Sequence, residues 1–490
     1  MKITTIEYRT GHISNKPCKT DLYYTRFANE LLDLLDGMCG RKFDNNELKY
    51  IARKLTWYFE DIVADSGIWR SFSNRCRKML GYNVPMYHDD EEYYDDEPSL
   101  DAVRYIIWDV YAEVNDCFPY AMSCDLKAVA DAAYSFLDLH FEDAPINEEL
   151  VKYNDDYISK AIQGFLPMRE VLIMLTQSHY LVAGSWFYEY MNDGRQSMKK
   201  WADRMSPGMI DHYLTTKFMF FSNCGPLAIK PYEWLEALLR ARGMDNVADD
   251  IAQIDAMKEC RFLTKQRNDK GVTLESEFGK TIDVSYEELN IAKEEFDKYD
   301  GCAGSFIWYQ GEWHLNGILM PIDYQEGFEK VMAENIPAEG TKFADADYYL
   351  QRTDGKQLLF FKDGKAMLDF MHNTLKLPGS SQEGTILAMD HPCFFIDAKA
   401  KKDCVYIVPE TELSIASHDN PYYDKKYAEK NAADLLHDKN ACSTELLCHL
   451  IDNDLLPDVA YSGIFCSNLP ASTLRSDMHF IARTMRRHKY

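Results

Sequence analysis

The sequence predicts an α+β protein: a mainly helical N-terminal region, then an antiparallel-sheet α+β region that ends in helices. Up to about residue 265, apolar residues recur at the three-to-four-residue spacing of amphipathic helices. After residue 301 the spacing changes to the alternation of strands, and from residue 424 it becomes helical again. Strand pairs followed by helices are typical of an α+β domain with an antiparallel sheet.

The first region carries several stretches with one apolar face, as core-facing helices do. They predict helices over residues 21–35, 48–62, 100–114 and 126–139. Residues 231–242 begin with proline and are followed by Gly243, the usual signals of a helix start and stop. A second helix is predicted directly after it, over 247–262.

The segment 266–300 predicts an acidic linker between domains. From residue 268 to residue 300 it holds ten acids and four bases, with little apolar periodicity before about residue 286. Charged segments of this kind are typical of exposed domain boundaries. We therefore predict a helical domain over 1–265, the linker, and an α+β domain with C-terminal helices over 301–490.

In the α+β domain, Asp354-Gly355 stands between two aromatic and apolar runs, residues 348–352 and 357–362. This dipeptide between two such runs is the strongest short signal for a β-hairpin. Further elements are predicted as strands over 305–310, 313–321, 385–397 and 404–408, and as a helix over 365–375.

The acidic composition excludes several classes of function. The 490 residues include 54 Lys+Arg and 79 Asp+Glu, a net charge of −25, whereas nucleic-acid binders need a positive surface. The 13 cysteines include no Cys-x-x-Cys pair, and the first residues lack the apolar run of a signal peptide, which predicts a cytoplasmic protein. No uninterrupted apolar run of about 18 residues exists, so no membrane span is predicted.

Two motifs resemble cofactor sites but have the wrong spacing. Gly279-Lys280-Thr281 has Leu274 where a phosphate-binding loop needs its first glycine. The second set offers possible zinc ligands at His437, Cys442, Cys448 and His449. Because Cys448 and His449 are adjacent on a predicted helix, they point about 100° apart and converge poorly on one ion. We expect no cofactor and no metal.

The candidate catalytic residues are Glu60 and Asp61, which lie inside an otherwise apolar and aromatic predicted helix. A buried carboxylate must be paired or have its pKa raised, and a raised pKa suits a general acid or base. The alternative, which we favour, is a structural ion pair. Its candidate partners are Arg26, Arg53 and Arg70.

Residues 474–488 predict a helix with one apolar stripe and a basic flank. From Arg475 to Tyr490 there are five Lys or Arg and one acid, a local charge of +4. The stripe could dock on the protein's own core, bind an acidic partner or contact nucleic-acid phosphates. We expect docking on the protein's own core, because the tether raises its effective concentration to roughly millimolar.

Four runs stand out in the first ninety residues: TDLYY at 20–24, YFEDI at 58–62, GIWRSF at 67–72 and GYNVPMY at 81–87. Through these runs the chain resembles an uncharacterised protein family from gut Bacteroidetes, most clearly over residues 18–90. The resemblance implies a bacterial, intracellular protein of this general length. It implies no activity, so no catalytic role is carried over.

Three functions remain after these exclusions. The leading interpretation is a non-enzymatic cytoplasmic protein that recognises a protein partner. The first alternative is a hydrolase with a carboxylate site near Glu60 and Asp61, and the second is a nucleic-acid-associated factor that uses the basic C-terminal helix. The sequence leaves the oligomeric state open.

Overall fold

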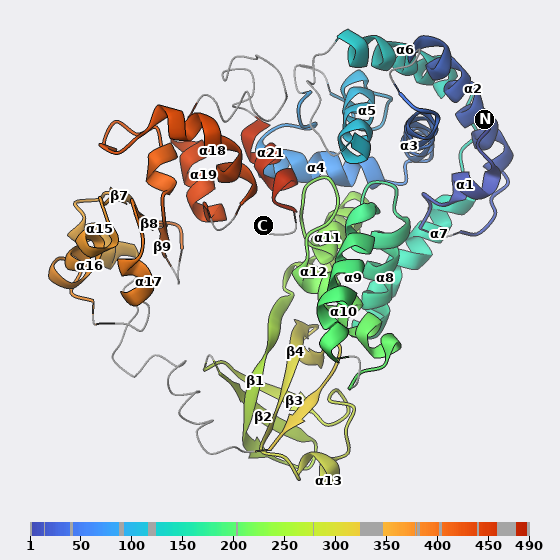
Figure 1. Ribbon diagram of the computed structural model, residues 1–490. Coiled ribbons are helices and arrows are strands. Elements are labelled where there is room, and N and C mark those ends of the chain that lie inside the picture. The colour runs from blue at the N-terminus through green and yellow to red at the C-terminus, as the bar shows by residue number, and fades with distance from the viewer. Residues whose placement is uncertain are drawn as a thin grey trace. The chain divides into compact units, whose positions relative to one another are not determined.

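The computed structural model describes residues 2–13, 15–39, 43–87, 93–115, 124–201, 204–277, 279–323, 346–377, 379, 383–400, 404–438, 441–457 and 477–487. They form two compact units, one made of the described residues up to 323 and one of those from 346 onward (Figure 1). Helices come first in the chain, antiparallel sheets follow, and helices close it, so the predicted fold class is confirmed. None of the helices in these ranges has both the length and the apolar character that a membrane span needs.

The first unit begins with twelve α-helices in the described ranges. They are α1 (Thr5–Arg9), α2 (Asp21–Cys39), α3 (Asn45–Ala64), α4 (Ile68–Leu80), α5 (Leu100–Asn115), α6 (Cys124–Phe141), α7 (Glu148–Ile158), α8 (Phe165–Ser178), α9 (Ser185–Ser197), α10 (Pro207–Phe221), α11 (Pro231–Ala241) and α12 (Asp245–Ala252). The helices predicted over 21–35, 48–62, 100–114, 126–139 and 231–242 are confirmed. The helix predicted over 247–262 is wrong after Ala252, because a strand begins at Asp255.

An antiparallel sheet follows these helices. Its strands are β1 (Asp255–Arg267), β2 (Gly271–Ser276), β3 (Thr281–Ser285), β4 (Gly301–Tyr309), β5 (Glu312–Leu315) and β6 (Met320–Ile322), with helix α13 (Lys293–Phe296) before β4. The strand order is β3-β2-β1-β4-β5, and β6 pairs with the start of β4. Residues 266–300, expected to be a linker, therefore hold two paired strands and a helix.

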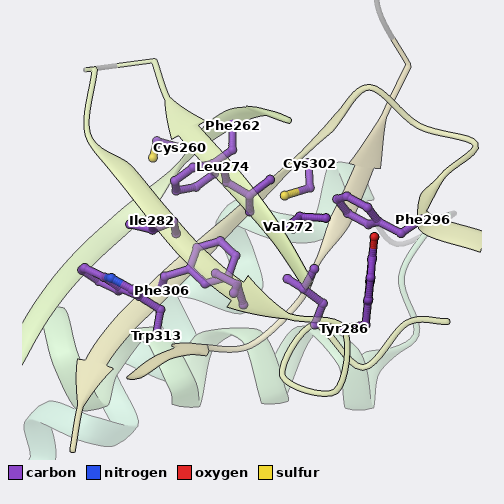
Figure 2. Packing of buried hydrophobic residues seen from close by; sticks show 12 residues of the cluster. Cys260, Phe262, Val272, Leu274, Ile282, Tyr286, Phe296, Cys302, Phe306 and Trp313 are labelled. Carbon is purple, nitrogen blue, oxygen red and sulfur yellow. The ribbon is translucent and has the colours of Figure 1, made fainter. Parts of the chain in front are cut away.

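The acids of this segment lie in turns, in α13 or at the more exposed strand positions, such as Glu275 and Asp283. Val272 and Leu274 on β2 are buried, as are Ile282 and Val284 on β3, and the residues between them are more exposed. The buried side chains join a core cluster with residues of β1 and β4 (Figure 2). Alternation of this kind is the period-two pattern of a half-buried strand.

The sheet is attached to the helices of the same unit by polar and aromatic contacts. The hydroxyl of Tyr309 on β4 donates to the carbonyl of Ala161, 2.6 Å away. His314 on β5 stacks on Phe165 of α8 with ring centroids 4.7 Å apart. These contacts fix the start of α8 and the sheet as neighbours.

The second unit has a smaller antiparallel sheet, ordered β7-β8-β9, with helices around it. Its elements are α15 (Ala346–Arg352), β7 (Leu358–Phe360), α16 (Gly364–Asn373), α17 (Glu383–Leu387), β8 (Cys393–Ile396), β9 (Val405–Val408), α18 (Lys425–His437), α19 (Thr444–Asp452) and α21 (Met478–Met485). The predicted hairpin at Asp354-Gly355 is wrong, because residues 346–352 are helical. Both residues have positive φ and end α15, where the Gly355 N–H donates to the carbonyl of Leu350.

Helix α21 docks on α18 and α19 of the second unit, so the expected self-docking of the C-terminal helix is confirmed for its described residues. Met478, Ile481 and Ala482 of the apolar stripe are buried, whereas Leu474 lies outside the described residues. Arg486 is also buried, and its guanidinium donates to backbone carbonyls at the end of α18 and beyond, including Leu436 and Cys442, both 2.6 Å away. One of the five basic residues between Arg475 and Tyr490 is therefore buried and hydrogen-bonded within the protein.

Limited proteolysis should not cut the folded chain within residues 271–285. The backbone of β2 and β3 is hydrogen-bonded across the hairpin and packed on the core cluster, so a protease reaches it only after unfolding. Fragment mass spectrometry over a time course measures this. Early cuts within 271–285 that leave two folded fragments would support the linker interpretation instead.

Replacing Arg486 with methionine should lower the free energy of unfolding of the second unit by about 3 kcal/mol, because several buried carbonyls lose a charged donor. Denaturant titration of the full chain measures the change. Arg483→Met on the half-buried side of the same helix is the matched control. Equal losses in the two variants would show that the guanidinium contacts are not important for docking.

Candidate functional site

Glu60, in the buried helix α3, binds three neutral or basic groups from other segments. The Tyr8 hydroxyl and the His12 Nε2 both contact its Oε2, the latter at 2.8 Å. The side-chain amide of Asn147 donates to its Oε1 at 2.7 Å. Burial and the nearby Glu60 carboxylate raise the pKa of Tyr8, which therefore stays protonated and donates.

Asp61 points to a different set of groups, all of them donors. The N–H groups of Ile68 and Trp69, at the start of α4, lie 3.0 and 2.5 Å from its two oxygens. The hydroxyls of Ser66 and Tyr180 lie 2.5 and 2.9 Å away. Burial raises the pKa of Asp61, although each of these hydrogen bonds acts in the opposite direction.

No ion pair joins Arg26, Arg53 or Arg70 to either carboxylate in the described part of the chain, and two of these arginines bind elsewhere. Arg70 pairs with Asp65 at 2.7 Å, and the guanidinium of Arg53 lies over the rings of Tyr50 and Trp57. The two carboxylates are thus held by hydroxyl, amide, imidazole and backbone donors rather than by arginine. The expected structural role fits this geometry, but the expected charged partners are wrong.

A cavity of about 10 Å³ borders both carboxylates, together with Trp57, His12 and Asn154. Within the described part of the chain, Nδ1 of His12 and both polar atoms of the Asn154 side chain have no hydrogen-bond partner. A space of this size suits one water molecule and excludes an organic substrate. A catalytic role for Glu60 and Asp61 stays a hypothesis that this geometry does not favour.

A larger cleft, of about 440 Å³, lies between helix α10 and the sheet. One wall is a β-bulge in β1, where Lys258 and Glu259 together oppose the single residue Ser305 of β4. A bulge turns side chains away from the regular alternation, and all three of these residues line the cleft. The irregularity of the strand therefore shapes the site.

The opposite wall comes from α10 and from Tyr190 in the middle of α9. The Tyr213 hydroxyl donates to the Glu259 carboxylate across the cleft, and Lys217 Nζ lies 3.3 Å from that hydroxyl. Burial raises the pKa of Tyr190 to about 12, although a hydrogen bond with Ser222 lowers it. Both phenols are therefore neutral at physiological pH.

Asn316, which follows β5, is one of the residues that line the cleft. It is 4% exposed, and its Nδ2 donates to the Thr216 carbonyl of α10 at 3.0 Å. Its Oδ1 is buried and accepts no hydrogen bond from any described residue. The next residue is Gly317 (φ +97°), where a Cβ would lie 2.7 Å from the Thr216 Oγ1, so the close approach to α10 needs glycine.

The residues considered as cofactor or metal ligands do not gather in one place. Gly279 and Lys280 form the turn between β2 and β3, and Lys280 pairs with Asp255. Cys442 is buried, while His449 packs against the ring of Phe395, with centroids 5.0 Å apart. The side chain of His437 lies outside the described residues. No group of three or more metal-binding side chains occurs in the described ranges.

Sequence reasoning did not find the cleft, because its walls come from four segments between residues 190 and 316. Two local signals point to it in retrospect. The charged pair Lys258-Glu259 interrupts the alternation of β1, and Asn316-Gly317 marks a tight turn beside another element.

The chain belongs to a family described as "Protein of unknown function (DUF3843)", whose model matches residues 7–262 and 329–487. No curated protein and no solved structure matches the chain. The unmatched residues 263–328 span the second part of β1 and the strands β2 to β6. The sheet thus lies largely outside the part of the chain that matches the family model.

Replacing Asp61 with asparagine should lower the free energy of unfolding at neutral pH by about 3 kcal/mol, because an NH₂ group would face hydrogen-bond donors. The loss should be largest at acid pH. Burial raises the folded-state pKa of Asp61, so the wild type loses stability as the pH rises from about 4 through that pKa. The asparagine of the variant does not titrate, so its stability lacks this change. The difference between the two proteins is therefore largest at acid pH.

Chemical denaturation at several pH values measures both effects. Asp65→Asn, at the exposed end of the same helix, is the control and should change stability by less than about 0.5 kcal/mol. A difference between wild type and Asp61→Asn that grows with pH would contradict the assigned direction.

Proposed function

We propose that this protein binds a small organic anion in the cleft between α10 and the sheet, and that its role is recognition rather than catalysis. The observation that carries the proposal is the buried Oδ1 of Asn316, which accepts no hydrogen bond from the described residues. Asn316 lines a cleft that also presents two lysines. The proposal keeps the non-enzymatic interpretation of the sequence and replaces the protein partner with a small ligand.

The amide oxygen of Asn316 supports a ligand that carries an N–H or O–H group. A buried acceptor without a donor costs about 1–3 kcal/mol, and a ligand donor would recover that free energy on binding. The amide is held in place, because its Nδ2 already donates to the Thr216 carbonyl. The acceptor is therefore oriented before a ligand arrives.

The charges of the cleft support a ligand with a carboxylate or phosphate group. Lys217 and Lys258 bring two positive charges, and no described residue forms an ion pair with Lys258. The one carboxylate, Glu259, already accepts a hydrogen bond from Tyr213. A local charge of +1 from these lining residues stands out in a chain of net charge −25.

The size and lining of the cleft favour binding over catalysis. Its volume of about 440 Å³ is typical of small-molecule sites, and Tyr190, Tyr213 and Phe221 offer rings to a planar group. The described lining residues include no histidine and no cysteine. The Ser305 hydroxyl donates to the Met257 carbonyl at 2.8 Å, which does not suit a nucleophile that awaits a base.

We also propose a cytoplasmic location, which the cysteines support. The nine cysteines whose side chains are described are all thiols, as expected in a reducing compartment. A bacterial source and a protein partner stay predictions from the sequence. The nucleic-acid alternative gains no support, because Arg486 of the basic helix is buried and α21 is docked on its own unit.

Replacing Lys217 and Lys258 together with alanine should weaken binding of a small anion about thirtyfold, at roughly 1 kcal/mol for each exposed charge contact. Native mass spectrometry of the purified chain finds any co-purifying ligand. Calorimetry with adenosine monophosphate and with glutamate then compares a phosphate with a carboxylate.

Lys265→Ala, on the same strand but paired with Glu275, is the matched control and should bind as the wild type does. Asn316→Ala should weaken binding independently of salt, whereas the lysine variants should lose their effect at high salt. Saturable binding of equal strength in all variants would place the ligand elsewhere.

A further inference from the structure

One cysteine of the second unit differs from the others in exposure. Among the nine cysteines with described side chains, eight are buried and only Cys448, on α19, is partly exposed. Burial raises the pKa of the Cys442 thiol to about 12 and of the Cys393 thiol well above its usual range, so both stay protonated and unreactive. Cys448 is thus the only one of these nine cysteines that is partly exposed to solvent.

Cys448 lies beside a histidine and a carboxylate. His479 is the second residue of α21, and Nε2 of its imidazole lies 2.9 Å from Oδ1 of Asp452. Cys448 is the first of the groups that raise the pKa of this imidazole. Cys448 and Asp452 are four residues apart on α19, so they lie on one face of that helix. The docking of α21 on α19 brings the imidazole to both.

The charges around this group favour a protonated imidazole. The hydrogen bond with Cys448 and the contact with Asp452 raise the pKa of His479, although burial lowers it. Burial alone would raise the pKa of Asp452, but hydrogen bonds from His479 and Lys399 bring it below its usual value. Asp397, Lys399 and His449 are the other titratable groups that act here, and burial keeps the pKa of His449 low.

We propose that Cys448, His479 and Asp452 form a nucleophilic thiol site that takes up acyl groups from activated esters or thioesters. Cys448 is the nucleophile, His479 is the acid–base partner, and Asp452 is a positioning residue that holds the imidazole. A nucleophile next to a base that a third group orients is the general arrangement of covalent acyl transfer. The proposal is independent of the anion cleft in the first unit.

In the acylation step, the Cys448 thiolate forms a bond from Sγ to the carbonyl carbon of the ester. The bond from that carbon to the leaving oxygen breaks, and the leaving group takes a proton from the His479 imidazolium. The products are an S-acyl Cys448, the free alcohol and a neutral His479. No oxidant, reductant or metal takes part.

A second histidine in the same unit is a control for the effect of the thiol. His372 on α16 lies 3.4 Å from Glu383, and its side chain is 38% exposed, close to the 36% of His479. It is thus a histidine–carboxylate pair of similar exposure without a described cysteine contact. All three residues of the proposed site lie within the part of the chain that matches the family model.

The test treats the full-length protein with p-nitrophenyl acetate and locates the acetyl group by peptide mass spectrometry, over a range of pH. We expect one acetyl group per chain, on Cys448, with a rate that is half-maximal at a lower pH than the value of about 8.5 of an ordinary thiol. His479→Ala should move the midpoint back to about 8.5. Asp452→Asn should move it part of the way.

His372→Ala is the control and should leave the rate and the midpoint unchanged. Thermal melting checks that each variant folds. If His479→Ala does not fold, Asp452→Asn and the wild-type pH profile decide the question. Acetylation confined to lysines, or a Cys448 profile with the midpoint of an ordinary thiol, would overturn the proposal.

Discussion

Two adjacent carboxylates of helix α3 hold several segments of the first unit together. Consecutive residues of a helix point about 100° apart, so Glu60 reaches the region of α1 and the start of α7, while Asp61 reaches the start of α4 and the second residue after α8. Helix α4 has no side-chain cap of its own, since its N-cap is Gly67. Asp61 accepts the first N–H groups of α4 instead, where the helix dipole favours a negative charge.

The same arrangement explains why these carboxylates are poor candidates for catalysis. A general acid or base needs an oxygen that a substrate can reach, and here every carboxylate oxygen is taken by a donor from the chain itself. The adjoining cavity has room for about one water molecule. A perturbed pKa at Asp61 therefore records burial in a hydrogen-bond network, which structural sites produce as readily as active sites do.

Much of the fold could be predicted from apolar spacing, and the errors have definite causes. The helices α2, α3, α5, α6 and α11 follow the expected ranges closely, because each buries one face along its whole length. Residues 266–300 resemble a linker in sequence because their acidic residues outnumber their basic ones. The four apolar residues that alternate along the two strands and face the core are Val272, Leu274, Ile282 and Val284. The hairpin prediction at Asp354-Gly355 is wrong because residues in the left-handed region end helices as well as forming hairpin turns.

The sites were harder to predict than the fold, because tertiary contacts create them. The burial of Glu60 and Asp61 could be expected from their helix, but their partners come from residues up to 119 positions away. The Lys258–Glu259 bulge has meaning only opposite Ser305 and α10. No local pattern relates residue 448 to residue 479.

The three polar clusters differ in one physical respect, which is how far the chain satisfies them by itself. Around Glu60 and Asp61 the donors and acceptors of the carboxylates are matched, and the result is rigidity. In the cleft, the Asn316 oxygen is held in place but lacks a donor among the described residues, which is the condition for binding something else. At Cys448 the neighbouring His479 is held by Asp452, and the cysteine is partly exposed to solvent. Similar side chains thus serve stability, recognition or reactivity according to which atom is left accessible.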